Sequence, residues 1–178
     1  MSDAIRSTKG HPGEAMEPTG NPMKDGVGAA SWAKDRADHP DLTLEGEPKI
    51  QPMSILSGWE VHPKDPNPLG ASVIDAEGVV VGTVDDLWVD RSEPAIRFLS
   101  VKLAQGGGSR LLPMGYAKVK KTRDGVIIKV VAIYAAQFAD VPQPKHPDRI
   151  TLLEEDKVFA WFAGGYRYAD ATRLDPLF

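Results

Sequence analysis

A short acidic turn between two apolar, β-branched runs carries the residues of this chain best suited to chemistry. Asp90, Glu93 and Arg97 stand around this turn, and Pro94 biases Glu93 away from helical geometry. Carboxylates held together beside an apolar wall have raised, coupled pKa values, which suits proton transfer near neutral pH, whereas a nearby arginine lowers them. The residues alone leave two interpretations open: a proton relay, or a surface cluster of ion pairs.

Patterns typical of enzymes and metal sites do not occur in the sequence. No nucleophile and base stand in a recognisable arrangement, so we predict no catalytic residue. The chain has no cysteine, which excludes disulfides and thiolate zinc sites. The histidines lie near prolines without the spacing of helical metal ligands, and we interpret them as solvated loop residues: His11, His39, His62 and His146.

A basic hairpin is the second charged feature of the sequence. It contains Lys118, Lys120, Lys121, Arg123 and Lys129. One interpretation is a solvated strand face, and the other is attraction to anionic lipid head groups, which requires the hairpin to face a membrane. The formal net charge of −4 argues against nucleic acid as the main partner.

The elements that position these charges are mainly strands. Part-alternating apolar runs bounded by Gly, Pro and Asp predict a small antiparallel β-barrel over residues 58–131. Asp124-Gly125 is a hairpin signal, and Gly106–Gly108 is expected to be a hairpin connection rather than a phosphate loop, because no Lys-Ser/Thr follows it. Strands are predicted near residues 70–75, 79–89, 96–103, 109–114, 116–121 and 126–131.

A connector and a C-terminal helix are expected over residues 132–178. The helix is predicted over residues 152–163, because Thr151 and Glu154 form a capping box and two glycines follow at Gly164-Gly165. Trp161 and Phe162 on this helix are either ordinary core residues or anchors for a partner. The sequence does not decide between these two interpretations.

The first third of the chain has no clear periodicity. Residues 1–25, rich in Gly and Pro, are predicted to form an extended or disordered arm, because they bury too little apolar surface to offset their ordering entropy. Residues 26–57, with Trp32 as an apolar anchor, are predicted to be an irregular segment that wraps on partner subunits. Neither a signal peptide nor a run of about 20 apolar residues is encoded.

Six motifs, in this order, resemble the cytoplasmic domain of the H subunit of photosynthetic reaction centres of the purple-bacterial type, a PRC-barrel fold. The resemblance covers residues 20–169. The motifs are NPMKDGVGAASW (Asn21–Trp32), PKIQPM (Pro48–Met53), VDDLWVD (Val84–Asp90), IRFLSV (Ile96–Val101), SRLLPM (Ser109–Met114) and TLLEEDKVFAWFAGGYRYA (Thr151–Ala169).

This resemblance implies a non-catalytic subunit that caps and stabilises the L and M subunits and assists proton delivery to the secondary quinone during light-driven electron transfer. Its expected place is the cytoplasmic face of the bacterial inner membrane, held there through partner subunits. No cofactor is expected on this chain alone. Quinone, bacteriochlorophyll, bacteriopheophytin and iron are expected in the partner subunits, and antenna proteins are further expected neighbours.

The resemblance also implies roles for individual residues. It places Glu93, Asp90 and Arg97 near the secondary quinone, and it makes Trp32, Trp161 and Phe162 candidates for the subunit interface. Where the family often has a pair of histidines for proton entry, this chain has two glutamates. Proton entry is therefore predicted at Glu45 and Glu47, or at the nearby His39 and Asp41.

The chain departs from the family at its start, where a polar, proline-rich segment stands in place of an N-terminal transmembrane helix. We expect that helix to be a separate anchor polypeptide, the alternative being a trimmed form. Two other functions compete with the subunit. A free-standing PRC-barrel adaptor would not need the segment Asn21–Trp32 or the aromatic helix, and a small hydrolase would need a nucleophile–base pair or a metal cluster.

Overall fold

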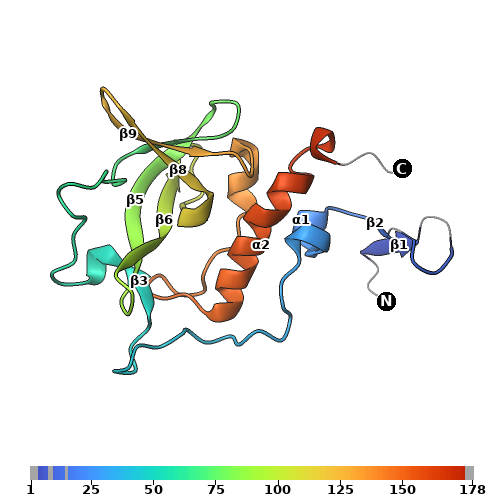
Figure 1. Cartoon of the computed structure of the whole chain (residues 1–178), viewed down its shortest axis with the longest axis horizontal. Helices are drawn as coiled ribbons and strands as arrows, with labels where there is room; N and C mark the ends of the chain where they lie inside the picture. Colours follow the sequence, from blue (N-terminus) through green and yellow to red (C-terminus); the bar gives the residue numbers. More distant parts are fainter. Residues whose placement is uncertain (1–3, 8–9, 15, 175–178) are drawn as a thin grey trace.

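A curled sheet packed against one long helix dominates the computed structural model, which describes residues 4–7, 10–14 and 16–174 (Figure 1). The strands are β1 (Ile5–Ser7), β2 (Met16–Pro18), β3 (Ile50–Pro52), β4 (Ser72–Ile74), β5 (Val80–Asp90), β6 (Ala95–Leu103), β7 (Ser109–Pro113), β8 (Ala117–Thr122) and β9 (Gly125–Val130). The helices are α1 (Pro22–Asp25) and α2 (Leu152–Tyr168), with 3-10 turns η1 (Gly28–Ala30), η2 (Met53–Ile55), η3 (Met114–Tyr116), η4 (Ala135–Asp140) and η5 (Ala171–Arg173).

The seven-stranded sheet has the order β7-β6-β5-β4-β9-β8, and β3 pairs with β5 beside this path. All six predicted strands are present, within a few residues of the expected bounds. Two details differ from an antiparallel barrel. The pair β4–β9 is parallel, and the path of paired strands does not close into a barrel. The parallel pair arises because β4 and β9 are joined through four intervening strands rather than by a hairpin.

Both predicted hairpin connections are present. Gly106, Gly107 and Gly108 all have positive φ values, of 83°, 90° and 84°, and join β6 to β7. Glycine takes up this backbone conformation without the steric cost that a Cβ atom imposes. The β8–β9 hairpin closes between Thr122 and Gly125, whose φ is 129°.

The N-terminal segments contain more regular structure than their composition suggested. β1 and β2 pair as a small antiparallel hairpin within the described part of residues 1–25. The predicted irregular segment 26–57 contributes β3 to the main sheet, where Ile50 lies opposite Asp90. A three-residue strand that ends in proline leaves little periodicity to recognise in a sequence.

Helix α2 starts as predicted and ends later than predicted. The Thr151 hydroxyl accepts from the Glu154 amide at 3.1 Å, and the Glu154 carboxylate accepts from the Thr151 amide at 2.9 Å. The predicted end at residue 163 is wrong, because the helix runs through both glycines to Tyr168. A Cβ atom on Gly164 would lie 2.5 Å from the Cβ atom of Ala30. The glycines therefore allow close packing rather than ending the helix.

The polypeptide before β3 is joined to the first turn of α2 by hydrogen bonds. The amides of Leu152 and Leu153 donate to the carbonyl oxygens of His39 at 3.1 Å and Ala37 at 3.0 Å. The Asp38 carboxylate accepts from the Thr151 hydroxyl at 3.0 Å. These bonds satisfy amides that a helix N-terminus otherwise leaves without intrahelical partners. In Figure 1 this segment crosses below the sheet and reaches the lower end of α2.

Replacing Gly164 by alanine is expected to destabilise the protein. The added methyl group meets Ala30, including its Cα atom at 3.0 Å, and such overpacking costs about 1–3 kcal/mol. This exceeds the gain of up to about 1 kcal/mol in helix propensity. Urea unfolding of the full chain measures the difference. Gly115→Ala is the control, since nothing lies within 4 Å of its added Cβ atom. Equal stability of Gly164→Ala and wild type would contradict the packing argument.

Candidate functional site

The acidic turn opens onto a pocket of about 290 Å³ formed by four separate parts of the chain. The charged groups come from residues 36–41, from Lys49 directly before β3, from residues 90–97 around the β5–β6 turn and from the first turns of α2. The charged lining residues are Arg36, Asp41, Lys49, Asp90, Glu93, Arg97, Glu155 and Asp156, and Ile50, Leu152 and Phe159 complete the wall. Five carboxylates therefore face three basic groups around one hollow.

Asp90 is the buried acid of this pocket, with 2% of its surface exposed. One carboxylate oxygen accepts from the amides of Ser92 at 2.9 Å and Glu93 at 3.1 Å. Its other oxygen lies 3.7 Å from Nζ of Lys49. Asp90 therefore holds the β5–β6 turn in shape and so sets the position of Glu93, which is exposed on the turn.

Glu155, in the first turn of α2, has the largest pKa shift among the groups that line the pocket. Burial raises the pKa of its carboxyl to about 7. The Arg97 guanidinium opposes this shift in pKa, and the carboxylates of Asp41 and Asp156 add to it. A carboxyl group with a pKa near 7 exchanges a proton readily at neutral pH, which is the property a relay needs.

The other charges of the pocket are partly paired. Nζ of Lys49 also lies 3.6 Å from a carboxylate oxygen of Asp41, so this lysine bridges two acids that come from different segments. Nε of Arg36 lies 3.7 Å from a carboxylate oxygen of Asp156. The pocket thus holds an excess of acids over bases, and protonation of Glu155 reduces that excess.

Two family models match this chain. The model described as photosynthetic reaction centre, H-chain N-terminal region, matches residues 2–55. The model of the PRC-barrel domain matches residues 64–133, which hold strands β4 to β9. The chain is an H-subunit-like protein of the photosynthetic reaction centre. The resemblance found in the sequence motifs is thereby confirmed, and so is the PRC-barrel domain with its C-terminal helix.

The pocket of this H-subunit-like chain brings together four of the predicted proton-transfer residues, Asp90, Glu93, Arg97 and Asp41. Sequence reasoning missed Glu155 as a site residue. It used the start of this helix only for the capping box of Thr151 and Glu154, and an acid in the first turn of a helix is common because the helix dipole favours it. The available signal was the aromatic residue one turn later, Phe159, which marks this side of the helix as partly buried.

The remaining predicted entry residues lie outside the lining of the pocket. Glu45 and Glu47 are exposed on a tight turn, where the Thr43 amide donates to the Glu47 carbonyl at 2.8 Å. At the base of this turn stand Asp41 and Lys49, both of which line the pocket. The neighbouring Thr43 side chain holds the pKa of Glu45 below its usual range.

His39 is exposed, and its ring Nδ1 lies 3.0 Å from the carbonyl oxygen of Pro40. Its main-chain carbonyl caps helix α2. A proton-entry role for Glu45, Glu47 and His39 stays a prediction, as do the relay roles of the pocket residues.

Two of the three predicted interface residues belong to the core of this chain. Trp161 is 5% exposed and Phe162 is fully buried, with its ring 5.9 Å from that of Phe138. Their use as partner anchors is therefore corrected to core packing, because they lie on the side of α2 that covers the sheet and its connector. Trp32 is half-buried and lines an open groove beside Phe159, so a role in an interface stays a prediction for this residue.

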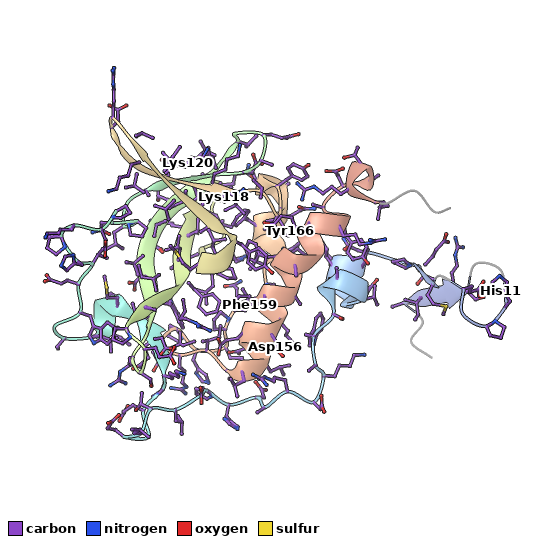
Figure 2. All side chains as sticks on the ribbon, viewed as in Figure 1. His11, Lys118, Lys120, Asp156, Phe159 and Tyr166 are labelled. Carbon is purple, nitrogen blue, oxygen red and sulfur yellow. The ribbon has the colours of Figure 1, made fainter. Side chains whose placement is uncertain are left out.

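The basic hairpin projects from the end of the molecule opposite the β5–β6 turn (Figure 1). In Figure 2, Lys118 and Lys120 lie on this hairpin, whereas Asp156 and Phe159 lie on the lower half of α2. Lys118 stands directly opposite Lys129 across the two strands, an arrangement of like charges that costs stability. Binding of anionic lipid head groups to this face stays a prediction.

The structure also bears on membrane crossing and on metals. Within residues 4–7, 10–14 and 16–174, no helix is both long and apolar enough to span a membrane. The same described residues contain no group of three or more His, Cys, Asp or Glu side chains placed to hold a metal ion. All four histidines are exposed.

The raised pKa of Glu155 predicts a pH-dependent stability. A carboxyl group whose pKa rises from 4.5 to about 7 on folding contributes its full stability below pH 4.5 and loses it as pH rises towards 7. Wild type should therefore lose on the order of 2 kcal/mol, relative to Glu155→Gln, between pH 4.5 and pH 8, after allowance for partial exposure. Urea unfolding at both pH values measures this.

A matched control is Glu60→Gln, which removes an exposed acid outside the pocket. It should follow the wild-type dependence on pH. If Glu155→Gln follows it as well, Glu155 does not titrate with a raised pKa.

Proposed function

We propose that this chain caps the cytoplasmic side of the reaction-centre core, the L and M subunits, and helps to deliver protons to the secondary quinone. The membership of the H-chain family and the acidic pocket support this proposal. Under this proposal, the chain itself binds no cofactor. The quinone, bacteriochlorophyll, bacteriopheophytin and iron belong to the partner subunits, and the chain is a non-enzymatic subunit.

The observation that carries the proposal is the carboxyl group of Glu155, with a pKa of about 7, in a pocket shared with Glu93 and Asp41. Full reduction of a quinone consumes two protons, so a route to it needs groups that both take up and release protons near pH 7. A volume of about 290 Å³ holds several water molecules, which link carboxylates that do not touch.

The proposed route enters at the turn that carries Glu45 and Glu47 and follows its base to Asp41. Since Asp41 and Glu155 line the same pocket, a proton moves from there to Glu155 and on to Glu93, the exposed acid of the β5–β6 turn. Arg97 keeps the pKa of Glu155 from rising further. Asp90, held by two amides, fixes the turn and takes a positioning role.

A free-standing PRC-barrel adaptor is the competing function. The match of residues 2–55 to the H-chain N-terminal region favours the subunit, because an adaptor consisting of the barrel alone needs no such segment. Strand β3 of this segment pairs with β5, so the segment and the PRC-barrel domain form parts of one fold.

In the assembled reaction centre, Glu155→Gln should slow the second electron transfer to the quinone, the step that requires a proton, about tenfold or more at pH 8. Such a factor corresponds to at least about 1.4 kcal/mol on the barrier. Glu93→Gln should have an effect of similar size. Flash-induced absorbance changes measure electron transfer, and a pH-indicator dye measures proton uptake.

The control is Asp124→Asn, which removes one negative charge at the hairpin tip without touching the pocket. First electron transfer should stay unchanged in all three variants, since it needs no stoichiometric proton. Unaltered second electron transfer in both pocket variants, with an intact complex, would reduce the proposal to capping alone.

A further inference from the structure

The last strand of the main sheet, β8, has a free edge. In the order β7-β6-β5-β4-β9-β8 it stands at the end, with β9 as its paired neighbour. Among the described residues, the main chain of residues 118–122 forms no hydrogen bond outside the β8–β9 hairpin. This edge therefore offers a row of amides and carbonyl groups with which another extended chain can pair.

Basic side chains are concentrated on the same hairpin, which carries Lys118, Lys120, Lys121, Arg123 and Lys129. Within the part of the chain that the structure describes, none of these five groups takes part in an ion pair. The chain as a whole has a formal net charge of −4, so this positive charge is local. An acidic partner is therefore attracted to the hairpin rather than to the molecule as a whole.

The alternation of side chains along β8 gives its two faces different chemistry. Lys118 and Lys120 are exposed on one face, because alternate residues of a strand share a face. Ala117 and Val119 lie on the other face, half-buried against the hydrophobic core, and Lys121 follows them nearer the tip. A strand added beside β8 continues both faces. It matches this edge when its own residues alternate between acidic and apolar.

The position of Lys129 shows where a counter-charge is missing. It stands directly opposite Lys118 on the neighbouring strand, and like charges in such a pair destabilise a sheet. On its other side stands Ile74 of β4, which brings no charge. The remaining place in this row is the free edge beyond Lys118. A carboxylate placed there offsets the repulsion between the two lysines.

Lysines on an edge strand also limit which partners can pair with it. Two copies of this chain that met through their β8 edges would bring like charges together, so the edge is protected against self-association. An acidic strand meets no such repulsion. A lipid head group carries negative charge as well, but it has no main chain to pair with the edge. Charge and free edge together therefore fit an acidic peptide better than a membrane surface.

We propose that β8 is a docking edge for an extended segment of a partner protein with alternating acidic and apolar residues, which adds to the sheet as a further strand. Its carboxylates lie beside Lys118 and Lys120, and its apolar side chains lie beside Ala117 and Val119. In this mode of recognition, main-chain hydrogen bonds supply affinity and alternate side chains supply specificity. The hairpin lies at the end of the molecule opposite the β5–β6 turn (Figure 1), so the inference does not depend on the proposed proton route.

The test uses the full chain, labelled with ¹⁵N, and the end-blocked peptide Val-Glu-Val-Glu-Val-Glu-Val. This peptide should shift the amide signals of residues 117–130 in a saturable manner. It should also slow the hydrogen exchange of those β8 amides that face the free edge. The same peptide with glutamine in place of glutamate should bind about tenfold more weakly, because it lacks the charges that pair with lysine. The fully N-methylated peptide should not bind, since it cannot pair through its main chain.

Two variants of the chain test the lysines. Lys118→Gln should weaken binding of the peptide about threefold, and its combination with Lys120→Gln about tenfold, because each change removes an opposite-charge pair between strands. Both variants should fold, since they reduce the repulsion between like charges on the hairpin. The control is Lys34→Gln, which makes the same change of net charge as Lys118→Gln at an exposed residue outside the hairpin. It should bind the peptide as wild type does.

Several results would overturn the proposal. Equal weakening by Lys34→Gln and Lys118→Gln would show general charge attraction. Undiminished binding of the N-methylated peptide would show that no strand is added. The remaining contrary result is that the peptide fails to bind while vesicles of phosphatidylglycerol do, with weaker binding in the double variant. That result would make the hairpin a membrane-binding surface.

Discussion

The contact between the first turn of α2 and residues 37–39 is the constraint on which the rest of this structure depends. A helix N-terminus presents amides that must find acceptors, and here two of them find main-chain carbonyl oxygens from a segment more than a hundred positions earlier. Asp38 adds a side-chain bond to Thr151. Since Asp41 follows directly and Glu155 lies one turn into the helix, this contact brings two acids of the pocket together.

The pocket shows how burial raises the pKa of one carboxyl group within a cluster of acids. Asp90 is more buried than Glu155, yet it receives two amide hydrogen bonds and lies near the Lys49 ammonium. The raised pKa of Glu155 arises chiefly from burial, and Asp41 and Asp156 add to it. Differences in pairing, rather than in residue type, therefore separate the acid that holds the turn from the acid that titrates near pH 7.

The sequence predicted the elements with a strong local signature and missed properties that arise from distant contacts. Alternation and turn residues identified the six main strands, and the capping box at Thr151 marked the start of α2. The end of α2 was misplaced because a glycine often follows the last residue of a helix. Gly164 instead lies inside α2, where its missing side chain lets Ala30 pack closely.

The same limitation applies to the candidate site. The turn residues Asp90, Glu93 and Arg97 are neighbours in the sequence, so their proximity could be predicted. The place of Glu155 beside Arg97 and Asp41, by contrast, depends on contacts between residues far apart in the sequence. The burial of Trp161 likewise depends on which side of α2 meets the sheet, and an aromatic-rich helix does not reveal that from its composition.

The order in which the chain is made gives the contact between residues 37–39 and α2 a further consequence. Synthesis proceeds from the N-terminus, so His39 and Ala37 leave the ribosome long before the amides of Leu152 and Leu153 exist. The sheet can pair in the meantime, because its strands lie between these two regions. The surface that receives Ala30 and carries Glu155 is completed only with the last helix. The pocket is thus complete only after α2 has been synthesised, and a nascent chain without this helix carries an unfinished pocket.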